Sequence, residues 1–276
     1  MPIWVMESKG RLAVVGTGIR AGCQLTEEAV HRIRSADVLL YGVSDPITEY
    51  LLQSLNPRHE SLVRFYSESK SRIETYEEMI ASILDHLRSG ESVCAAFYGH
   101  PGVFVYPSHE SIARARKEAF EAVMLPGISS EACLFADLGI DPGKFGYFSF
   151  EATDFVVSRK RIDNRSALVL WQADCVGDPG ISFEGFDGRY LPVLVDALLE
   201  WYDGAHEVII YTAPFLPISK PVMRRSTIRD LVDDLRRGLS MSTLYIPPAR
   251  RSVPSPERAA QLGLRLDQLL EHGEDA

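Results

Sequence analysis

The chain has 276 residues, a formal net charge of −9 at pH 7, 46% hydrophobic residues and 24% charged residues. This composition is ordinary for a globular protein of one large or two modest domains. The acidic balance and the lack of a basic patch disfavour a nucleic-acid partner. No apolar run reaches the length of a transmembrane helix, and the sequence contains neither a polybasic membrane anchor nor a signal-peptide pattern at its start. We therefore expect a cytoplasmic protein without a membrane partner.

The first half of the chain alternates short apolar runs with amphipathic segments. The runs predicted as strands are 11–18, 37–42, 92–99 and 121–127, and the segments predicted as helices are 25–36, 71–89 and 109–120. Thr26 is a candidate N-cap for the first helix. This alternation predicts an α/β domain with a largely parallel sheet.

The second half repeats the alternation with shorter connections. Helices are predicted over 129–139 and 190–202, and strands over 146–152, 166–172, 206–213 and 241–248. Short connections favour hairpins and a mixed sheet. We expect an N-terminal domain of residues 1–124, a C-terminal domain of residues 125–250, and a tail of residues 251–276 that forms a capped amphipathic helix with a frayed acidic end.

Cysteine and histidine spacing argues against a metal site. The four cysteines are widely separated and form no CxxC pair, which favours buried thiols in a reducing compartment. The seven histidines show no HExxH-like spacing, and nothing near His100 and His109 completes a ligand set. No metal is predicted.

Three strand-to-helix loops carry the unusual residues of the first half. Gly16 and Gly18 follow the first strand, and on spacing alone they favour a tight turn over a ligand loop. The sequence YGHPG (98–102) follows the third strand, at the kind of sheet edge where α/β proteins bind ligands. Ser129 and Ser130 precede a helix, where their hydroxyls either cap it or bind a polar ligand.

Taken together, these motifs resemble a known superfamily. RLAVVGTG, SADVLLYG, YGHPGVF, LPGISSEACLFADLGIDP and STLYIPP resemble, in order over residues 10–250, the tetrapyrrole (corrin and porphyrin) methylases. The resemblance implies two α/β domains with S-adenosylmethionine in the cleft between them. Two loops depart from the superfamily pattern: GTGI stands where Gly-Pro is usual, and YGHPG where Gly-Asp-Pro is usual.

These departures resemble one subgroup, the borosin (omphalotin-type) peptide methyltransferases, which methylate backbone amides of a ribosomal precursor peptide. The match rests on FYGHPGVFVYPSH, LPGISSEACLFADLGIDP, FEATDF and STLYIPP. The resemblance implies a catalytic set of Tyr66, Arg72, Tyr76 and Tyr98. On spacing alone, Arg72 and Tyr76 favour a solvated pair on a helix, and Tyr66 is equally a core or rim aromatic.

The implied chemistry gives each of these residues a task. An amide nitrogen is a poor nucleophile because its lone pair is delocalised into the carbonyl. Tyr76 would accept its proton, directly or through water, while Arg72 favours the phenolate or holds the developing oxyanion. Tyr66 would complete the hydrogen-bond network, and Tyr98 would orient the amide between cofactor and substrate.

The resemblance also implies the contacts of S-adenosylmethionine. They are Tyr98, His100, Val103, Phe104, Ser129, Ser130, Gln172, Tyr211, Ser242 and Thr243. From the residues alone, Gln172 is equally an ordinary end of a strand, and Ser242 and Thr243 are equally plain strand residues.

Fused borosin enzymes continue past IPP to a core peptide that they methylate on themselves, whereas this tail is charged and holds no Val/Ile/Gly-rich segment. The expectation is a split, trans-acting enzyme that forms a homodimer and, with a separate precursor, a heterotetramer. Two rival hypotheses remain: a methyltransferase acting on a tetrapyrrole or other small molecule, and a non-catalytic module that binds S-adenosylmethionine or a peptide. The genes beside this one would discriminate among them.

Overall fold

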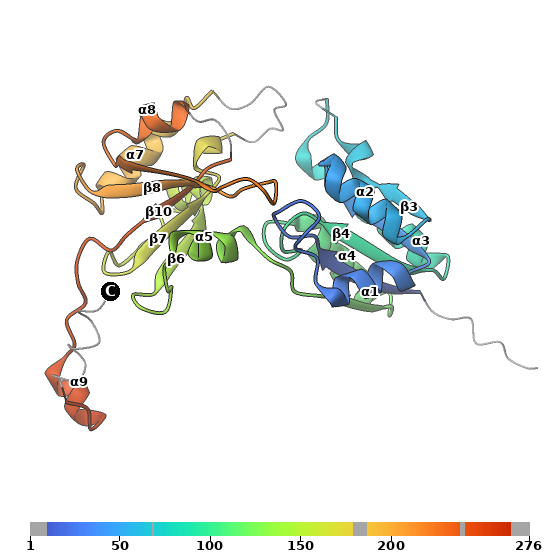
Figure 1. Cartoon of the computed structure of the whole chain (residues 1–276), viewed down its shortest axis with the longest axis horizontal. Coiled ribbons are helices and arrows are strands. Elements are labelled where there is room, and N and C mark those ends of the chain that lie inside the picture. The colour runs from blue at the N-terminus through green and yellow to red at the C-terminus, as the bar shows by residue number, and fades with distance from the viewer. Residues whose placement is uncertain (1–9, 68, 179–186, 238–240, 266–276) are drawn as a thin grey trace, which may run out of the picture. The chain divides into compact units, whose positions relative to one another are not determined.

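The computed structural model describes residues 10–67, 69–178, 187–237 and 241–265 (Figure 1). The described residues form two compact units. Unit 1 comprises Met1–Ile140, Asp178–Phe186 and Tyr211–Met223, and unit 2 comprises Asp141–Gly177, Asp187–Ile210 and Arg224–Ala276. Unit 1 therefore includes a helix, 130–138, that the sequence analysis assigned to the second domain. Hydrogen bonds from that helix to the loop after the first strand account for this assignment, as described below.

Unit 1 is built on a five-stranded sheet with the order β3-β2-β4-β1-β5, in which every pair is parallel. Its strands are β1 (Arg11–Gly16), β2 (Val38–Gly42), β3 (His59–Ser61), β4 (Ser92–Phe97) and β5 (Glu121–Met124). Its helices are α1 (Glu27–Ser35), α2 (Pro46–Leu55), the 3-10 turn η1 (Leu62–Phe65), α3 (Arg72–Arg88), α4 (Tyr106–Lys117) and α5 (Ser130–Leu138). The predicted parallel α/β arrangement is confirmed.

Both faces of this sheet are covered, which explains why its central strands are continuous apolar runs. Alternate strand residues such as Val14 and Ala95 pack under α3 and α4. Their neighbours Val15 and Ala96 pack under α1 and α2 instead.

Unit 2 holds most of a second five-stranded sheet with the order β6-β7-β10-β8-β9. Its strands are β6 (Tyr147–Glu151), β7 (Ala167–Trp171), β8 (Glu207–Thr212), β9 (Val222–Thr227) and β10 (Thr243–Ile246). Its helices are α6 (Ala152–Val157), the 3-10 turn η2 (Ala173–Cys175), α7 (Leu191–Leu199), α8 (Leu231–Arg236) and α9 (Pro256–Gln261). Because β6 and β7 are parallel while β7 and β10 are antiparallel, the predicted mixed sheet is confirmed.

Local signals in the sequence set several helix starts. Thr26 caps α1 by accepting from Ala29 N at 3.1 Å, as predicted. Ser71 and Glu74 form a capping box that starts α3 at Arg72. α4 begins at Tyr106 rather than at residue 109, because Pro107 suits a first turn.

The C-terminal tail was expected to be helical from its cap onward. Ser255 caps α9, accepting from Arg258 N at 3.3 Å, but the helix ends at Gln261. The rest of the expected acidic end, from residue 266, lies outside the described residues.

Candidate functional site

Three loops meet at the edge of the unit 1 sheet where the parallel strands end. The loops after β1 and β4 are joined by an antiparallel bridge between Gly18 and Gly99. Gly18 N donates to Gly99 O at 3.2 Å, and Gly99 N donates to Gly18 O at 2.9 Å. The residues that looked like a simple tight turn are therefore part of a platform made of backbone.

Glycine is needed here because the loops lie directly on one another. A Cβ added to Gly16 would stand 2.2 Å from Gly99 O and 2.8 Å from Pro101 Cδ. A Cβ on Gly127, in the loop after β5, would stand 3.2 Å from both Gly16 Cα and Gly99 O. Gly99 itself has φ +71°, a left-handed conformation that favours glycine.

The YGHPG loop turns tightly before α4. His100 Nδ1 accepts a hydrogen bond from Gly102 N at 2.9 Å, which leaves Nε2 to carry the proton of the neutral ring. Val103 N donates to His100 O at 3.2 Å, and Phe104 takes φ +57°. Val103 and Phe104 are consequently exposed, as large apolar side chains that face out of the loop.

The catalytic residues implied by the resemblance come together in part. Tyr66, just after η1, and Tyr76, on α3, lie close to one another, and the Arg72 guanidinium is close enough to act on Tyr66. Burial is the main cause that raises the pKa of Tyr66 to about 12; the neighbouring Tyr76 adds to the rise, and the charge of Arg72 opposes it.

Tyr106 joins this cluster, although sequence reasoning passed over it. Its ring stacks on Tyr76 with centroids 6.0 Å apart and planes at 30°. Arg114 of α4 fixes α4 against α3 by donating to both carboxylate oxygens of Glu77, at 2.6 and 2.8 Å. The available signal was Pro107, which places Tyr106 in the first turn of α4.

Tyr98 lies near a different set of residues from Tyr66 and Tyr76. Phe97, the residue before it, packs in the core under α3 and α4. Tyr98 is 44% exposed, and the groups that act on it are Cys133 of α5 and Asp45 before α2. Burial of part of the ring is the main cause that raises the pKa of Tyr98, and those two groups add to the rise.

α5 begins at the third loop of the platform. Ser129 is its N-cap and accepts from Ala132 N at 3.2 Å, and Ser130 is its first residue. Two side-chain contacts tie α5 to the loop after β1: Arg20 pairs with Asp137 at 3.3 Å, and Gln24 Nε2 lies 3.7 Å from Cys133 Sγ. The cap interpretation of Ser129 holds in this structure, and its oxygen keeps a second lone pair for a ligand.

Tyr211 is fully buried, with 1% of its surface exposed. Its hydroxyl donates to Asp137 Oδ2 at 2.7 Å. Burial, together with this carboxylate, raises the pKa of Tyr211 well above its ordinary value. The Tyr211 side chain therefore contacts α5 of unit 1 and is not exposed to solvent.

The remaining residues expected to bind the cofactor lie in unit 2. Gln172 ends β7 in a left-handed conformation, with φ +56°, which is uncommon for a residue other than glycine. Ser242 N donates to Asp174 Oδ1 at 2.9 Å, and both Ser242 and Thr243 are buried at the start of β10. Asp174 itself is buried, and its Oδ2 has no hydrogen-bond partner among the described residues. Sequence reasoning missed Asp174.

Within the described residues, no three His, Cys, Asp or Glu side chains gather in a way that suits a metal ion. The four cysteines are thiols, and Cys94, Cys133 and Cys175 are buried as predicted. The prediction is wrong for Cys23, which is exposed because it lies in the turn that follows the first loop. No helix of the described part of the chain combines the length and apolar character that crossing a membrane requires.

Comparison with known proteins identifies the family of this chain. A model of the tetrapyrrole (corrin/porphyrin) methylases matches residues 11–214. The chain is 43% identical over 257 residues to a methyltransferase/type III borosin cyclic peptide precursor of Anomoporia bombycina, covering 92% of this chain and 30% of that protein. It is 42% identical to the dendrothelin A precursor of Dendrothele bispora (88% and 58% covered) and 40% identical to the omphalotin A precursor of Omphalotus olearius (92% and 62%). The chain thus spans less than two thirds of these relatives.

Solved structures agree on the fold. A cobalt precorrin-4 methyltransferase is similar with a TM-score of 0.63 at 15% identity, covering 90% of this chain and 97% of that one. A uroporphyrin-III C-methyltransferase from Thermus thermophilus, complexed with S-adenyl homocysteine, has a TM-score of 0.61 at 18% identity, covering 86% and 97%. The two-domain α/β fold expected from the sequence is therefore confirmed.

Proposed function

Because the chain belongs to the tetrapyrrole (corrin/porphyrin) methylase family, we propose that it is a methyltransferase that uses S-adenosylmethionine to methylate backbone amide nitrogens of a peptide. The observation that carries this proposal is the cluster of Tyr66 and Tyr76 beside Arg72, with Tyr106 stacked on Tyr76. Amide N–H groups are very weak acids, so removal of their proton needs a positioned base such as Tyr76. The borosin relatives, which are both methyltransferases and peptide precursors by name, supply the substrate class.

The described residues suit the cofactor. The glycine platform lets a ligand lie against backbone, since a Cβ at Gly99 would meet only Ile19 Cδ1, at 3.3 Å. Exposed Val103 and Phe104 offer apolar surface to an adenine ring, and Ser129 stands at a helix N-terminus that favours a carboxylate. We assign the cofactor to these residues together with Tyr98, His100, Ser130, Gln172, Ser242 and Thr243. Tyr211, which the resemblance also implied, is left out because its buried hydroxyl donates to Asp137. When bound, the cofactor supplies an electrophilic methyl group on a sulfonium.

We assign proton removal to Tyr76. Tyr66 keeps its own proton because its pKa is about 12, which leaves Tyr76 as the proton acceptor. As the amide N–H bond breaks, its proton would pass to Tyr76 directly or through water, and negative charge would move to the carbonyl oxygen. Arg72 would stabilise that charge while the amide nitrogen takes up the methyl group that the bound cofactor supplies. The proton leaves Tyr76 to solvent afterwards.

The finer proposal is that the peptide is a separate precursor, bound by a homodimer. Residues 249–276 are largely polar and charged and hold no Val/Ile/Gly-rich segment that resembles a core peptide, so these residues are not the proposed substrate. Incubation of the chain with S-adenosylmethionine, alone or with the small protein encoded by the neighbouring gene, tests this directly. Methyl-mass increments on backbone amides of the added protein support methylation in trans, and increments on the chain itself support methylation in cis.

Tyr76→Phe is the decisive variant. It removes the proton acceptor and keeps the ring that stacks on Tyr106, so the rate should fall by about 10²–10⁴-fold. Affinity for S-adenosylmethionine, measured by calorimetry, should stay within about two-fold, since Tyr76 is assigned to proton removal and not to a cofactor contact. Tyr106→Phe is the matched control and should retain most of the rate. A Tyr76→Phe protein of wild-type activity would refute the assignment, and activity on a uroporphyrin-III-type tetrapyrrole instead of the peptide would replace the proposed substrate.

A further inference from the structure

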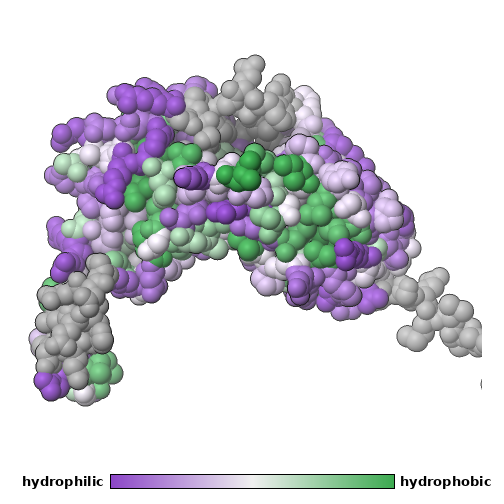
Figure 2. All heavy atoms as spheres, in the orientation of Figure 1, coloured by the Kyte–Doolittle hydropathy of each residue, from purple (hydrophilic) through white to green (hydrophobic). Residues whose placement is uncertain are grey.

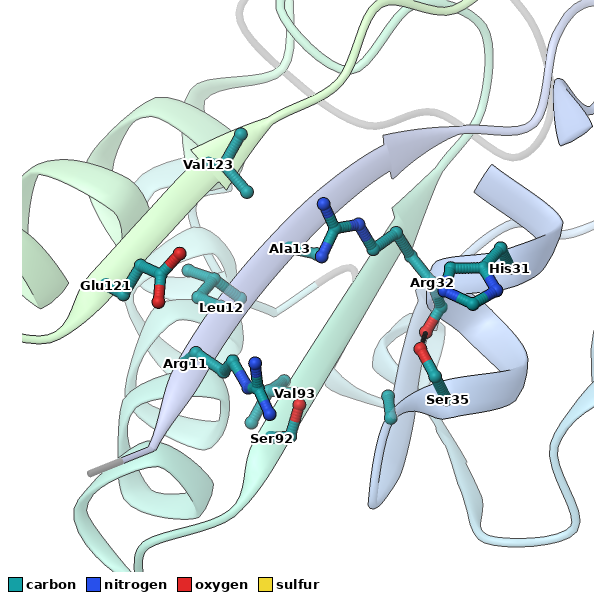
Figure 3. A pocket seen from close by; sticks show the side chains of 11 residues that line it. Arg11, Leu12, Ala13, His31, Arg32, Ser35, Ser92, Val93, Glu121 and Val123 are labelled. Atoms are coloured by element: carbon teal, nitrogen blue, oxygen red, sulfur yellow. Dashed lines mark hydrogen bonds between the residues drawn. The ribbon is translucent and has the colours of Figure 1, made fainter. Parts of the chain in front are cut away.

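A cavity lies at the edge of the unit 1 sheet where the strands begin (Figure 3). Arg11, Ser92 and Glu121, the first residues of β1, β4 and β5, all line it. α1 covers one side with His31, Arg32 and Ser35. The cavity has a volume of about 260 Å³ and lies at the opposite end of the strands from the glycine platform.

Arg32 is the central feature of this cavity. Figure 3 shows its side chain leaving α1 and extending across the sheet, with the guanidinium above Ala13 of β1. Its Nε is buried and has no hydrogen-bond partner among the described residues. The positive charge of Arg32 also acts on the Cys94 thiol. Burial raises the pKa of Cys94 to about 12, and Arg32 opposes that rise. A guanidinium N–H buried without an acceptor favours a ligand that supplies one.

The charges around Arg32 leave the cavity basic. Its one acidic neighbour on α1 is Glu28, whose Oε1 is 3.9 Å from Arg32 Nη2, a long and exposed contact. Arg11 enters from the strand side, and no ion pair among the described residues includes it. Glu121 is the single carboxylate of the lining. Two arginines against one glutamate make a basic cavity in a chain whose net charge is −9.

We propose that this cavity binds an oxyanion group, a phosphate or a carboxylate, between the guanidinium groups of Arg32 and Arg11. Guanidinium groups match the planar carboxylate and the phosphate equally well, because both present paired oxygen acceptors. Ser92 supplies a further hydroxyl donor at the lining, whereas the Ser35 hydroxyl donates to Arg32 O at 3.4 Å. The site is independent of the proposed methyl transfer.

Protein NMR titrations with inorganic phosphate and with acetate, at constant ionic strength set by chloride, test the proposal. Saturable shifts are expected at the amides of Ala13, Ser92 and Val123. Arg32→Gln should weaken binding by at least about ten-fold, the effect of losing a charge-assisted hydrogen bond. Arg34→Gln, the same change two residues away on α1 but outside this cavity, should change it less than about two-fold.

The titrations with phosphate and with acetate distinguish the source of the anion. Saturation by phosphate alone assigns the site to a phosphate ester or free phosphate, and saturation by acetate as well assigns it to a carboxylate. Arg11→Gln, at the exposed first position of β1, repeats the test if Arg32→Gln does not fold. Shifts that never saturate, or that are unchanged in both variants, overturn the proposal, because they indicate general screening of surface charge.

Discussion

Gly16→Ala is the sharpest test of the backbone platform. Gly16 has an ordinary φ, so the substitution adds no backbone strain, and its entire effect comes from the new methyl group. That methyl would stand 2.2 Å from Gly99 O, whereas ordinary contact begins at 3.4 Å. The loops after β1 and β4 must therefore separate by about 1 Å, because close-packed backbone cannot absorb the overlap.

The magnitude follows from what the separation breaks. Overpacking costs about 1–3 kcal/mol, and weakening the two Gly18–Gly99 hydrogen bonds adds about 1 kcal/mol. Together these predict a loss of about 3 kcal/mol, which for a chain of this size corresponds to a fall in Tm of about 6–12 °C. A displacement of about 1 Å at a substrate-positioning loop predicts a loss of about 10²-fold in rate.

Thermal unfolding by circular dichroism, calorimetric binding of S-adenosylmethionine and the methylation rate measure these effects. Gly139→Ala is the matched control, because φ is +66° there and a Cβ meets nothing within 4 Å. It should cost about 1–2 kcal/mol through left-handed strain alone and leave binding and rate intact. A Gly16→Ala protein with the Tm and cofactor affinity of the wild type would show that the loops yield freely, and the platform argument would fail.

Three further substitutions have distinct expected results. Tyr66→Phe should remove one phenol that titrates near pH 12 in an absorbance titration, and should slow methyl transfer by about ten-fold through loss of the hydroxyl beside Tyr76; an unchanged rate would separate Tyr66 from catalysis. Tyr211→Phe should cost about 1–3 kcal/mol by leaving Asp137 short of a donor, with unchanged cofactor affinity; a fall in affinity would show that Tyr211 contacts the cofactor after all. Burial raises the pKa of Asp174, so the unfolded chain ionises first as pH rises and stability should decline above about pH 4. Asp174→Asn, which keeps an acceptor for Ser242 N, should flatten that decline, and Tm measured from pH 4 to 7 would reveal a parallel curve if the reasoning is wrong.

The sheet of unit 1 was predictable because its strands are buried on both faces. Runs such as 11–18 and 92–99 stand out as continuous apolar segments, and Thr26 marks a helix start by its hydroxyl. The strand β9 was missed because Val222–Thr227 holds two arginines and a single buried residue, so it shows no buried apolar run. α2 was missed although Asp45 caps it and Pro46 begins it.

The site was predictable only where chemistry follows the local chain. Tyr66, Arg72 and Tyr76 lie within one turn-and-helix segment, and the structure brings them together. Tyr106 approaches Tyr76 from a different helix, and such a contact depends on packing that spacing does not record. Surface character is equally hard to anticipate: Figure 2 shows apolar side chains reaching the surface among polar ones, as Val103 and Phe104 do.

The bridge between Gly18 and Gly99 has an implication for how such a site can change over generations. Its contacts are made by backbone atoms, so they tolerate almost any exchange of side chains around them. An exposed residue at the rim that is not assigned to the cofactor, such as Tyr106, can therefore be replaced without disturbing the floor of the site. A scaffold of this kind separates the inherited part of an enzyme from its adjustable part, and laboratory selection for new peptide substrates would do best to randomise the rim and leave the glycines alone.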